Sequence, residues 1–209
     1  MLLTLALLLQ DPLAVRADTI RPRHHALHYD IAAAVSDTGR RFAAEVTTRW
    51  VLRSAGPVVL SLDTVFTLAG VWVSDKADAR LHRVAVPNLH GSIAIPVQGA
   101  VGDTVITRVR YSGMPRDGLV IRRAPDSSLT AFADNWPDRA HRWFPSQDVP
   151  GDKATAAFRI EAPKGYAVVA NGVLDRVDTL ANGRTVWRYR MTRPVSPYNL
   201  VFGLARFAV

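Results

Sequence analysis

Cysteine is absent from the 209 residues, and its absence excludes three classes of site. Without cysteine the chain cannot build a disulfide framework, a zinc ribbon or a thiol nucleophile. Any metal site in it would have to use histidine and carboxylate ligands. Lysine is scarce as well, because Lys76, Lys153 and Lys164 are the only three, so nearly all of the positive charge is arginine.

Helical periodicity is also lacking. From Asp18 onward no stretch places apolar residues at helical spacing over three turns, which nearly excludes helix as a main ingredient of the fold. The chain has no Ser/Gly-rich linker, no low-complexity block and no internal repeat. We therefore expect a single domain.

The charge balance is basic, with 26 Lys and Arg against 18 Asp and Glu. Such an excess can indicate an anionic partner such as nucleic acid or a membrane surface. The arginines, however, are scattered in runs of no more than two and are not interleaved with aromatic residues as a base-stacking surface requires. The pattern favours an evenly basic, solvated surface and no nucleic-acid partner.

The amino-terminal segment contains an apolar block from Leu2 to Leu9. The block is far shorter than the roughly 20 residues that cross a bilayer, so we expect no transmembrane segment. It suits the apolar region of a secretory signal, and Val15 and Ala17 are small residues at the −3 and −1 positions of a cleavage site. We expect residues 1–17 to be a signal peptide and the protein to be exported. No basic residue precedes the block, which leaves a misplaced start codon, a weak signal or a partly buried strand as alternatives.

Alternation of apolar and polar residues is abundant, and a period of two is typical of half-buried strands. The first two alternating runs are Tyr29–Val35 and Phe42–Leu52. Similar runs, closed by Gly, Pro, Asp or Asn, follow throughout the chain, and Asn182-Gly183 between two such runs predicts a hairpin. About a dozen strands predict an all-β fold with antiparallel sheets in a sandwich or a similar large twisted arrangement.

The stretch "FPSQDVPGDK" contains two prolines that exclude a regular element between them. Pro145 and Pro150 leave a short rigid loop that carries Asp148 and Lys153. We interpret this loop as structural: Asp148 accepts hydrogen bonds from the loop backbone, and Lys153 or Arg142 neutralises it.

The motifs around this loop, taken in order, resemble the N-terminal β domain of the aminopeptidase N-like (gluzincin) family of zinc metallopeptidases. That family has an "AR…P…D.P..KA" segment, then "NG", then a "MS.YL.AF..G.F" strand, and a "Y.G…GL" turn upstream. The residues that match are Ala140, Arg142, Pro145, Asp148, Pro150, Lys153, Ala154, Asn171, Gly172, Ser196, Tyr198, Phe202 and Phe207, with Tyr111, Gly113, Gly118 and Leu119 in the turn. The resemblance covers about Ile20 to Val209 and implies a saddle-shaped or sandwich-like β domain over residues 18–209.

The catalytic motifs of that family do not occur in the sequence. Its zinc is held by an HExxH helix with a further Glu, and a Gly-x-Met-Glu-Asn loop binds the substrate's amino group. None of these is present, so no residue here is assigned as catalytic or as a metal ligand, and zinc is expected only in the complete enzyme. The chain ends where the family's catalytic domain would begin, and the resemblance implies that this domain is its partner. His24 and His28 are four residues apart, but they follow a proline in an extended stretch without a Glu between them, which is a poor zinc site.

The resemblance also suggests a contact with the N-terminus of a peptide substrate. Many members have a Gln or Glu shortly before the conserved proline that helps to bind the free amine. Counting back from Pro145 gives Asp134, or Asn135 with a gap of one residue. Either side chain could accept a hydrogen bond from an ammonium group. The alternative is that the pair only caps the turn before Trp136-Pro137.

Two functional hypotheses follow. The first is the non-catalytic N-terminal domain of an exported zinc aminopeptidase, in which the domain forms part of the wall of the substrate cleft. The second is a free-standing β-sandwich module that binds peptides or envelope polyanions through a basic strip of Arg188, Arg190 and Arg193.

The last run of the chain bears on the first hypothesis. We expect "NLVFGLARFAV" either to pair centrally in a sheet or to contact further protein. In the second case Leu200, Phe202, Leu204 and Phe207 would be exposed in the isolated domain.

Overall fold

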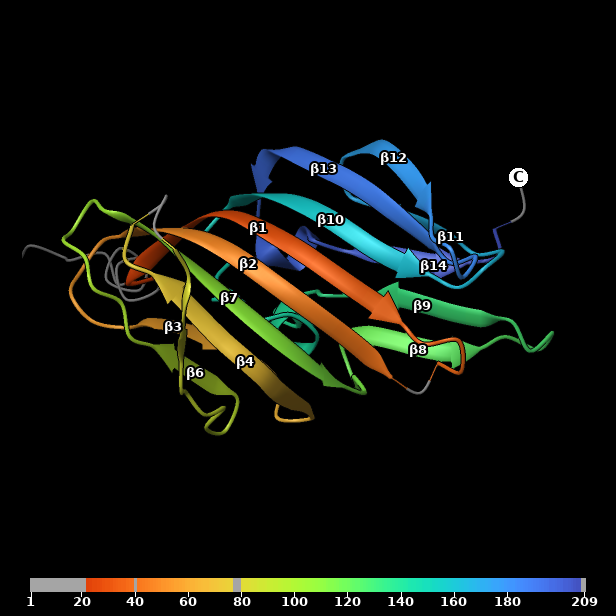
Figure 1. The fold of residues 1–209 in the computed structure, drawn as a ribbon, viewed down its shortest axis with the longest axis horizontal. Helices are drawn as coiled ribbons and strands as arrows, with labels where there is room; N and C mark the ends of the chain where they lie inside the picture. Colours follow the sequence, from red (N-terminus) through yellow and green to blue (C-terminus); the bar gives the residue numbers. More distant parts are fainter. Residues whose placement is uncertain (1–21, 40, 77–79, 208–209) are drawn as a thin grey trace, which may run out of the picture.

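The computed structural model describes residues 22–39, 41–76 and 80–207 (Figure 1). The predicted signal peptide, residues 1–17, lies outside the described residues. The described residues form strands and two 3-10 turns, η1 (Ala140–Arg142) and η2 (Pro197–Asn199). No described segment forms a helix long and apolar enough to cross a membrane.

The largest unit is a twisted sheet of eight strands in the order β12-β13-β10-β1-β2-β7-β4-β5. In that order the strands are β12 (Val173–Thr179), β13 (Thr185–Val195), β10 (Ala154–Ala162), β1 (His24–Val35), β2 (Phe42–Leu52), β7 (Thr104–Gly113), β4 (Phe66–Ser74) and β5 (His82–Val84). Two smaller sheets lie behind it in Figure 1. One has the order β11 (Ala167–Ala170), β14 (Phe202–Ala205), β9 (Leu129–Ala133) and β8 (Leu119–Arg123), and the other pairs β3 (Val58–Ser61) with β6 (Ser92–Ile95).

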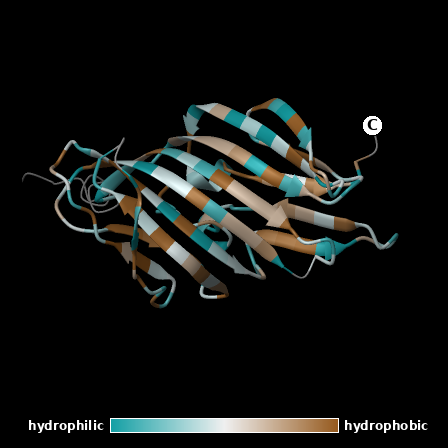
Figure 2. Ribbon diagram, in the orientation of Figure 1, coloured by the Kyte–Doolittle hydropathy of each residue, from teal (hydrophilic) through white to brown (hydrophobic). Residues whose placement is uncertain are grey.

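The predicted all-β fold is confirmed, and alternation is the reason that it could be predicted. In β2 every second side chain from Phe42 to Leu52 is buried, and the residues between them are half-buried or, at Arg49, exposed. Figure 2 shows the pattern along the ribbon, where hydrophilic and hydrophobic residues are mixed along the strands of the large sheet. One pair differs from the antiparallel expectation, because β1 and β10 run parallel. A parallel pair needs a long connection, and here the connection contains β2 to β9.

The core fills the space between the large sheet and the two small ones. Its largest fully buried side chains include Trp50, Trp143, Tyr29, Tyr111 and Phe144. Their rings meet edge to face, with centroids of Tyr29 and Phe144 5.7 Å apart. Because each aromatic side chain buries a large apolar area, this cluster provides much of the driving force that holds the layers together.

Two local predictions are confirmed. The hairpin at Asn182-Gly183 joins β12 to β13, and Gly183 has a positive φ of 78° that suits glycine. The last strand, β14, lies between β11 and β9, so it pairs centrally.

The expected exposure of the last run is wrong for three of its four residues. Leu200, Phe202 and Leu204 are buried, and only Phe207 is exposed, at 40%. The cause is that Phe202 and Leu204 are on the core side of β14, which pairs on both edges, and that Leu200 is buried where η2 leads into this strand.

Candidate functional site

Asp134 lies just beyond the end of β9, where the chain leaves the four-stranded sheet. Its backbone N–H donates to the carbonyl of Gly118, which extends the β8–β9 pairing by one step. Its carboxylate is 62% exposed and accepts a hydrogen bond of 2.6 Å from Nη2 of Arg139. The carboxylate is therefore positioned by one arginine and still accessible to a cationic ligand.

Asn135 is placed differently, because the alternation of β9 turns it inward. It is 1% exposed. Its amide nitrogen donates to the carbonyls of Leu200 (2.8 Å) and Pro197 (3.2 Å), and its amide oxygen accepts from Nε1 of Trp143 (2.7 Å). These three hydrogen bonds join the end of β9 to η2 and to Trp143, which follows η1. The prediction of an amine contact therefore concerns Asp134 alone.

Arg139 connects Asp134 to a second carboxylate. Its Nη1 lies 3.2 Å from Oδ1 of Asp117, and its Nε donates to the carbonyl of Trp136 at 2.7 Å. Partial burial works to raise the pKa of Asp117, but the Gly118 N–H and Arg139 outweigh it and hold that pKa below its ordinary value. Asp117 therefore stays ionised near neutral pH and keeps Arg139 in place.

Trp136 provides the exposed aromatic surface of the segment. It is 64% exposed, and its ring meets that of Tyr198 edge to face with centroids 5.2 Å apart. The peptide bond that joins it to Pro137 is cis.

The loop between Pro145 and Lys153 supports this segment through η1, but not with the predicted ion pairs. Oδ2 of Asp148 accepts hydrogen bonds from the backbone N–H (3.2 Å) and from Nδ1 (2.7 Å) of His141. Arg142 instead pairs with Asp63, at 3.0 Å. Lys153 is exposed and has no ion-pair partner among the described residues. The expected partner of Asp148 was wrong because His141, seven residues earlier, is brought beside it by the turn of η1.

Asp152 is a structural residue of this loop that the sequence analysis did not identify. It is 2% exposed, and its carboxylate accepts from the backbone N–H of Ala26 (3.0 Å) and from Nδ1 of His25 (2.5 Å). These contacts tie the start of β10 to the start of β1, 126 residues earlier. The only available signal was the apolar alternation after Lys153, which places Asp152 at the entrance to a strand.

The amino-terminal histidines are used by the fold and do not form a metal site. Nε2 of His24 is 3.0 Å from the carbonyl of Pro57, His25 contacts Asp152, and Nδ1 of His28 is 2.7 Å from Oγ1 of Thr155. Within residues 22–39, 41–76 and 80–207, no three His, Cys, Asp or Glu side chains stand close enough to hold a metal ion. The described residues therefore do not fit a zinc ion.

An apolar row crosses the outer face of the four-stranded sheet. Val120 pairs with Phe132, Phe132 with Gly203, and Gly203 with Val169, so the four residues lie side by side on β8, β9, β14 and β11. Val120, Phe132 and Val169 are exposed at 38%, 45% and 55%. The ring of Phe132 lies over Gly203, where a Cβ would come within 3.0 Å of it, and contacts Phe207 edge to face. We call these residues, with Phe207, the apolar row.

These features define an all-β domain that carries no metal centre in its described part and exposes an apolar row beside a partly free carboxylate. The family model of the peptidase M1 N-terminal domain matches residues 25–199, and the chain belongs to this family. A curated relative, "Probable aminopeptidase 1" of Saccharolobus solfataricus, is 29% identical over 68 residues, which are 32% of this chain and 9% of the relative.

A solved structure is similar over most of the chain. The M1 zinc metallopeptidase from Deinococcus radiodurans shares the fold with a TM-score of 0.75 and 21% identity, and the match covers 88% of this chain and 42% of that one. The matched regions therefore cover less than half the length of either of these two proteins.

Proposed function

We propose that this chain is the non-catalytic N-terminal domain of an exported zinc-dependent aminopeptidase, and that it forms part of the wall of the substrate cleft. The family match over residues 25–199 carries the proposal. The zinc would be held by the partner catalytic domain, since the residues described here do not fit it.

We place the contact with the catalytic domain on the apolar row. Four apolar side chains gathered on one sheet face mark an interaction surface better than scattered exposed residues do. The last strand belongs to this same sheet: β14 carries Gly203, and Phe207 lies two residues beyond its end. A domain that continues from this point would cover the row with little additional chain.

Asp134 would contact the free amine of the peptide. It follows Phe132 by two residues, and alternation along the strand puts both side chains on the outer face. A carboxylate beside the proposed domain contact would lie at the border of the cleft between the two domains. An exposed carboxylate held by one arginine can exchange part of that interaction for a substrate ammonium group.

The test uses the catalytic domain encoded by the reading frame that continues from this chain, produced together with it. Asp134→Asn removes the charge and keeps the shape, so KM for aminoacyl-anilide substrates should rise while kcat changes less. Asp138→Asn is the matched control, because Asp138 is exposed in the same segment and has no ion-pair partner among the described residues. Equal KM values for the two variants and the wild type would exclude the amine contact. Each protein without the catalytic half should give no zinc-dependent turnover.

The reading frame itself separates this function from the free-standing module. An HExxH motif encoded downstream would exclude the free-standing module. The basic strip that motivated the module is already partly neutralised, since Arg188 pairs with Asp178 at 2.8 Å and Arg190 with Asp175 at 2.6 Å.

Export is a separate part of the proposal and rests on the Leu2–Leu9 block and the Val15-Arg16-Ala17 site. Intact-mass measurement of protein from the periplasmic or extracellular fraction tests it. A species that begins at Asp18 is expected, and one that retains Met1 would contradict it.

A further inference from the structure

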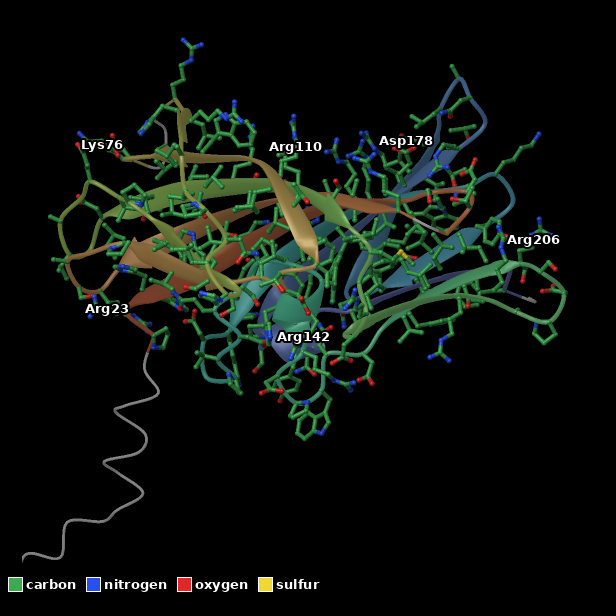
Figure 3. The ribbon with its side chains drawn as sticks, turned by 90° about the horizontal axis from the view of Figure 1, so that it is seen from below. Arg23, Lys76, Arg110, Arg142, Asp178 and Arg206 are labelled. Carbon is green, nitrogen blue, oxygen red and sulfur yellow. The ribbon has the colours of Figure 1, made fainter. Side chains whose placement is uncertain are left out.

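The outer face of the eight-stranded sheet is hollowed over β13, β10, β1, β2 and β7, near the end where β1 turns into β2. This face is turned away from the two small sheets, and in Figure 1 no other element lies in front of it. Its hollow has a volume of about 450 Å³. Figure 3 shows Arg110 and Asp178 projecting from this side of the molecule and Arg142 from the opposite side.

Alanines form the floor of the hollow. Ala32 and Ala34 of β1 and Ala43 of β2 point outward here, and Ala34 is directly opposite Ala43. Long polar side chains are usual on the solvent face of such strands, and three alanines leave space where those chains would stand. Leu180 and Val186 add apolar surface at the rim.

Arginines form one wall of the hollow. Arg159 on β10 is directly opposite Arg188 on β13, which is in turn opposite Arg176 on β12. Neighbouring strands are about 4.8 Å apart, so three like charges stand in one row, an arrangement that costs stability unless something compensates it.

The compensation within the protein is incomplete. Asp178 accepts from Nε of Arg188 at 2.8 Å and lies 3.3 Å from Nε of Arg176, so one carboxylate serves two arginines. Arg159 is exposed and has no hydrogen bond or ion pair within the described part of the chain.

The carboxylates that face the hollow are committed elsewhere or stand apart. Glu161 pairs with Arg184 at 2.5 Å, and Glu45 pairs with Arg110 at 2.6 Å. Asp30 lies diagonally from Arg159, opposite Ala157, and forms no ion pair with it. The charge left without a partner at this wall is therefore the Arg159 guanidinium.

We propose that this hollow binds a small ligand that has one oxyanion group, a carboxylate or a phosphate, on a short apolar body. Arg159 would bind the oxyanion with two parallel N–H donors, and Arg188 would add charge from the opposite strand. The apolar body would lie on Ala32, Ala34 and Ala43. The volume is within the range of small-molecule sites.

Titration of the isotopically labelled 209-residue chain, followed by amide chemical shifts, tests the proposal. Hexanoate should shift the amides of Ala32, Ala34, Ala43 and Arg159 and bind more tightly than acetate, which lacks the apolar body. Hexyl phosphate compared with hexanoate identifies the preferred oxyanion, and tighter binding of either one supports the site. Equal binding of acetate and hexanoate, or shifts confined to other parts of the molecule, would overturn it.

Two variants and a control make the test specific. Arg159→Gln should weaken hexanoate binding about tenfold, since a hydrogen bond to a charged group is lost. Ala34→Leu fills the floor without removing charge and should weaken hexanoate but not acetate. Arg122→Gln is the control, because Arg122 is exposed on the four-stranded sheet and also has no ion-pair partner among the described residues. Unchanged binding by Arg159→Gln, with folding verified by its melting temperature, would overturn the site.

Discussion

Asp148 and Asp152 lie in one loop and connect it to different parts of the molecule. Asp148 fastens the loop to η1 through His141, and its φ of 47° is one that aspartate tolerates better than most residues. Asp152 fastens the loop to β1 through His25. The sequence indicates a structural role for Asp148, because two prolines enclose it. It gives no such indication for Asp152, because the partners of Asp152 are more than a hundred residues away.

Replacing Asp148 by Ala should destabilise the domain by about 1–3 kcal/mol, because two donors of His141 would lose their acceptor. Lys153→Ala should change stability by less than about 0.5 kcal/mol, because that side chain is exposed and unpaired within the described residues. Urea denaturation of both variants measures the difference. An equal effect of the two substitutions would show that the loop is not organised around the Asp148 carboxylate.

His28 should make stability depend on pH. Partial burial lowers the pKa of His28 below its ordinary value, Asp30 opposes this and Arg49 adds to it. Between the lowered pKa and the ordinary value of about 6.5, the unfolded chain binds more protons than the folded one. The free energy of unfolding should therefore be highest above that range and fall as the pH drops through it.

His28→Gln removes this contribution, so its stability should fall less than that of the wild type between pH 7.5 and pH 5. His82→Gln is the control, because His82 is exposed on β5. Denaturation midpoints across this pH range provide the measurement, and parallel profiles for His28→Gln and the wild type would contradict the prediction.

The strands illustrate what alternation can and cannot predict. It predicted where the strands lie and the β12–β13 hairpin, because both depend on neighbouring residues. It did not predict the order of the sheet or the parallel β1–β10 pair, because pairing joins Tyr29 to Ala156 across most of the chain. At the candidate site the alternation of β9 also predicts which of Asp134 and Asn135 faces solvent. Leu129 and Ala131 are buried, so the same phase turns Asn135 inward and Asp134 outward.

The turn between β11 and β12 depends on a glycine. Gly172 has a φ of 94°, and a Cβ there would come within 2.1 Å of the carbonyl oxygen of Arg190. Gly172→Ala should therefore cost about 2–5 kcal/mol, combining backbone strain with a clash against main-chain atoms. Gly151→Ala has open space around its Cβ and should be neutral or stabilising by up to about 1 kcal/mol. Thermal and urea unfolding compare the two, and a tolerated Gly172→Ala would contradict this close approach of β13.

The whole molecule has two outer faces with different chemistry. The open face of the eight-stranded sheet has charged walls around an alanine floor, and the outer face of the four-stranded sheet has the apolar row. Separation of this kind suits a domain that docks another domain on one side and remains in contact with solvent on the other. It also means that the two proposed sites can be tested independently of each other.

The apolar row should control association. We expect the isolated chain to self-associate, or to bind a catalytic domain supplied in trans, because the row removes apolar surface from water in either case. Phe132→Lys places a charge at the centre of the row and should weaken either association about tenfold or more. The melting temperature should change little, because the Phe132 ring is 45% exposed in the isolated domain. Val101→Lys is the matched control, since Val101 is 67% exposed in the loop between β6 and β7, next to Gly102, which bonds to Leu52 at the end of β2 and lies outside the four-stranded sheet. Sizing chromatography with multi-angle light scattering, with and without the catalytic half, measures both associations. If Phe132→Lys associates as the wild type does, or if Val101→Lys weakens association as much as Phe132→Lys does, the assignment of the docking surface to the apolar row is wrong.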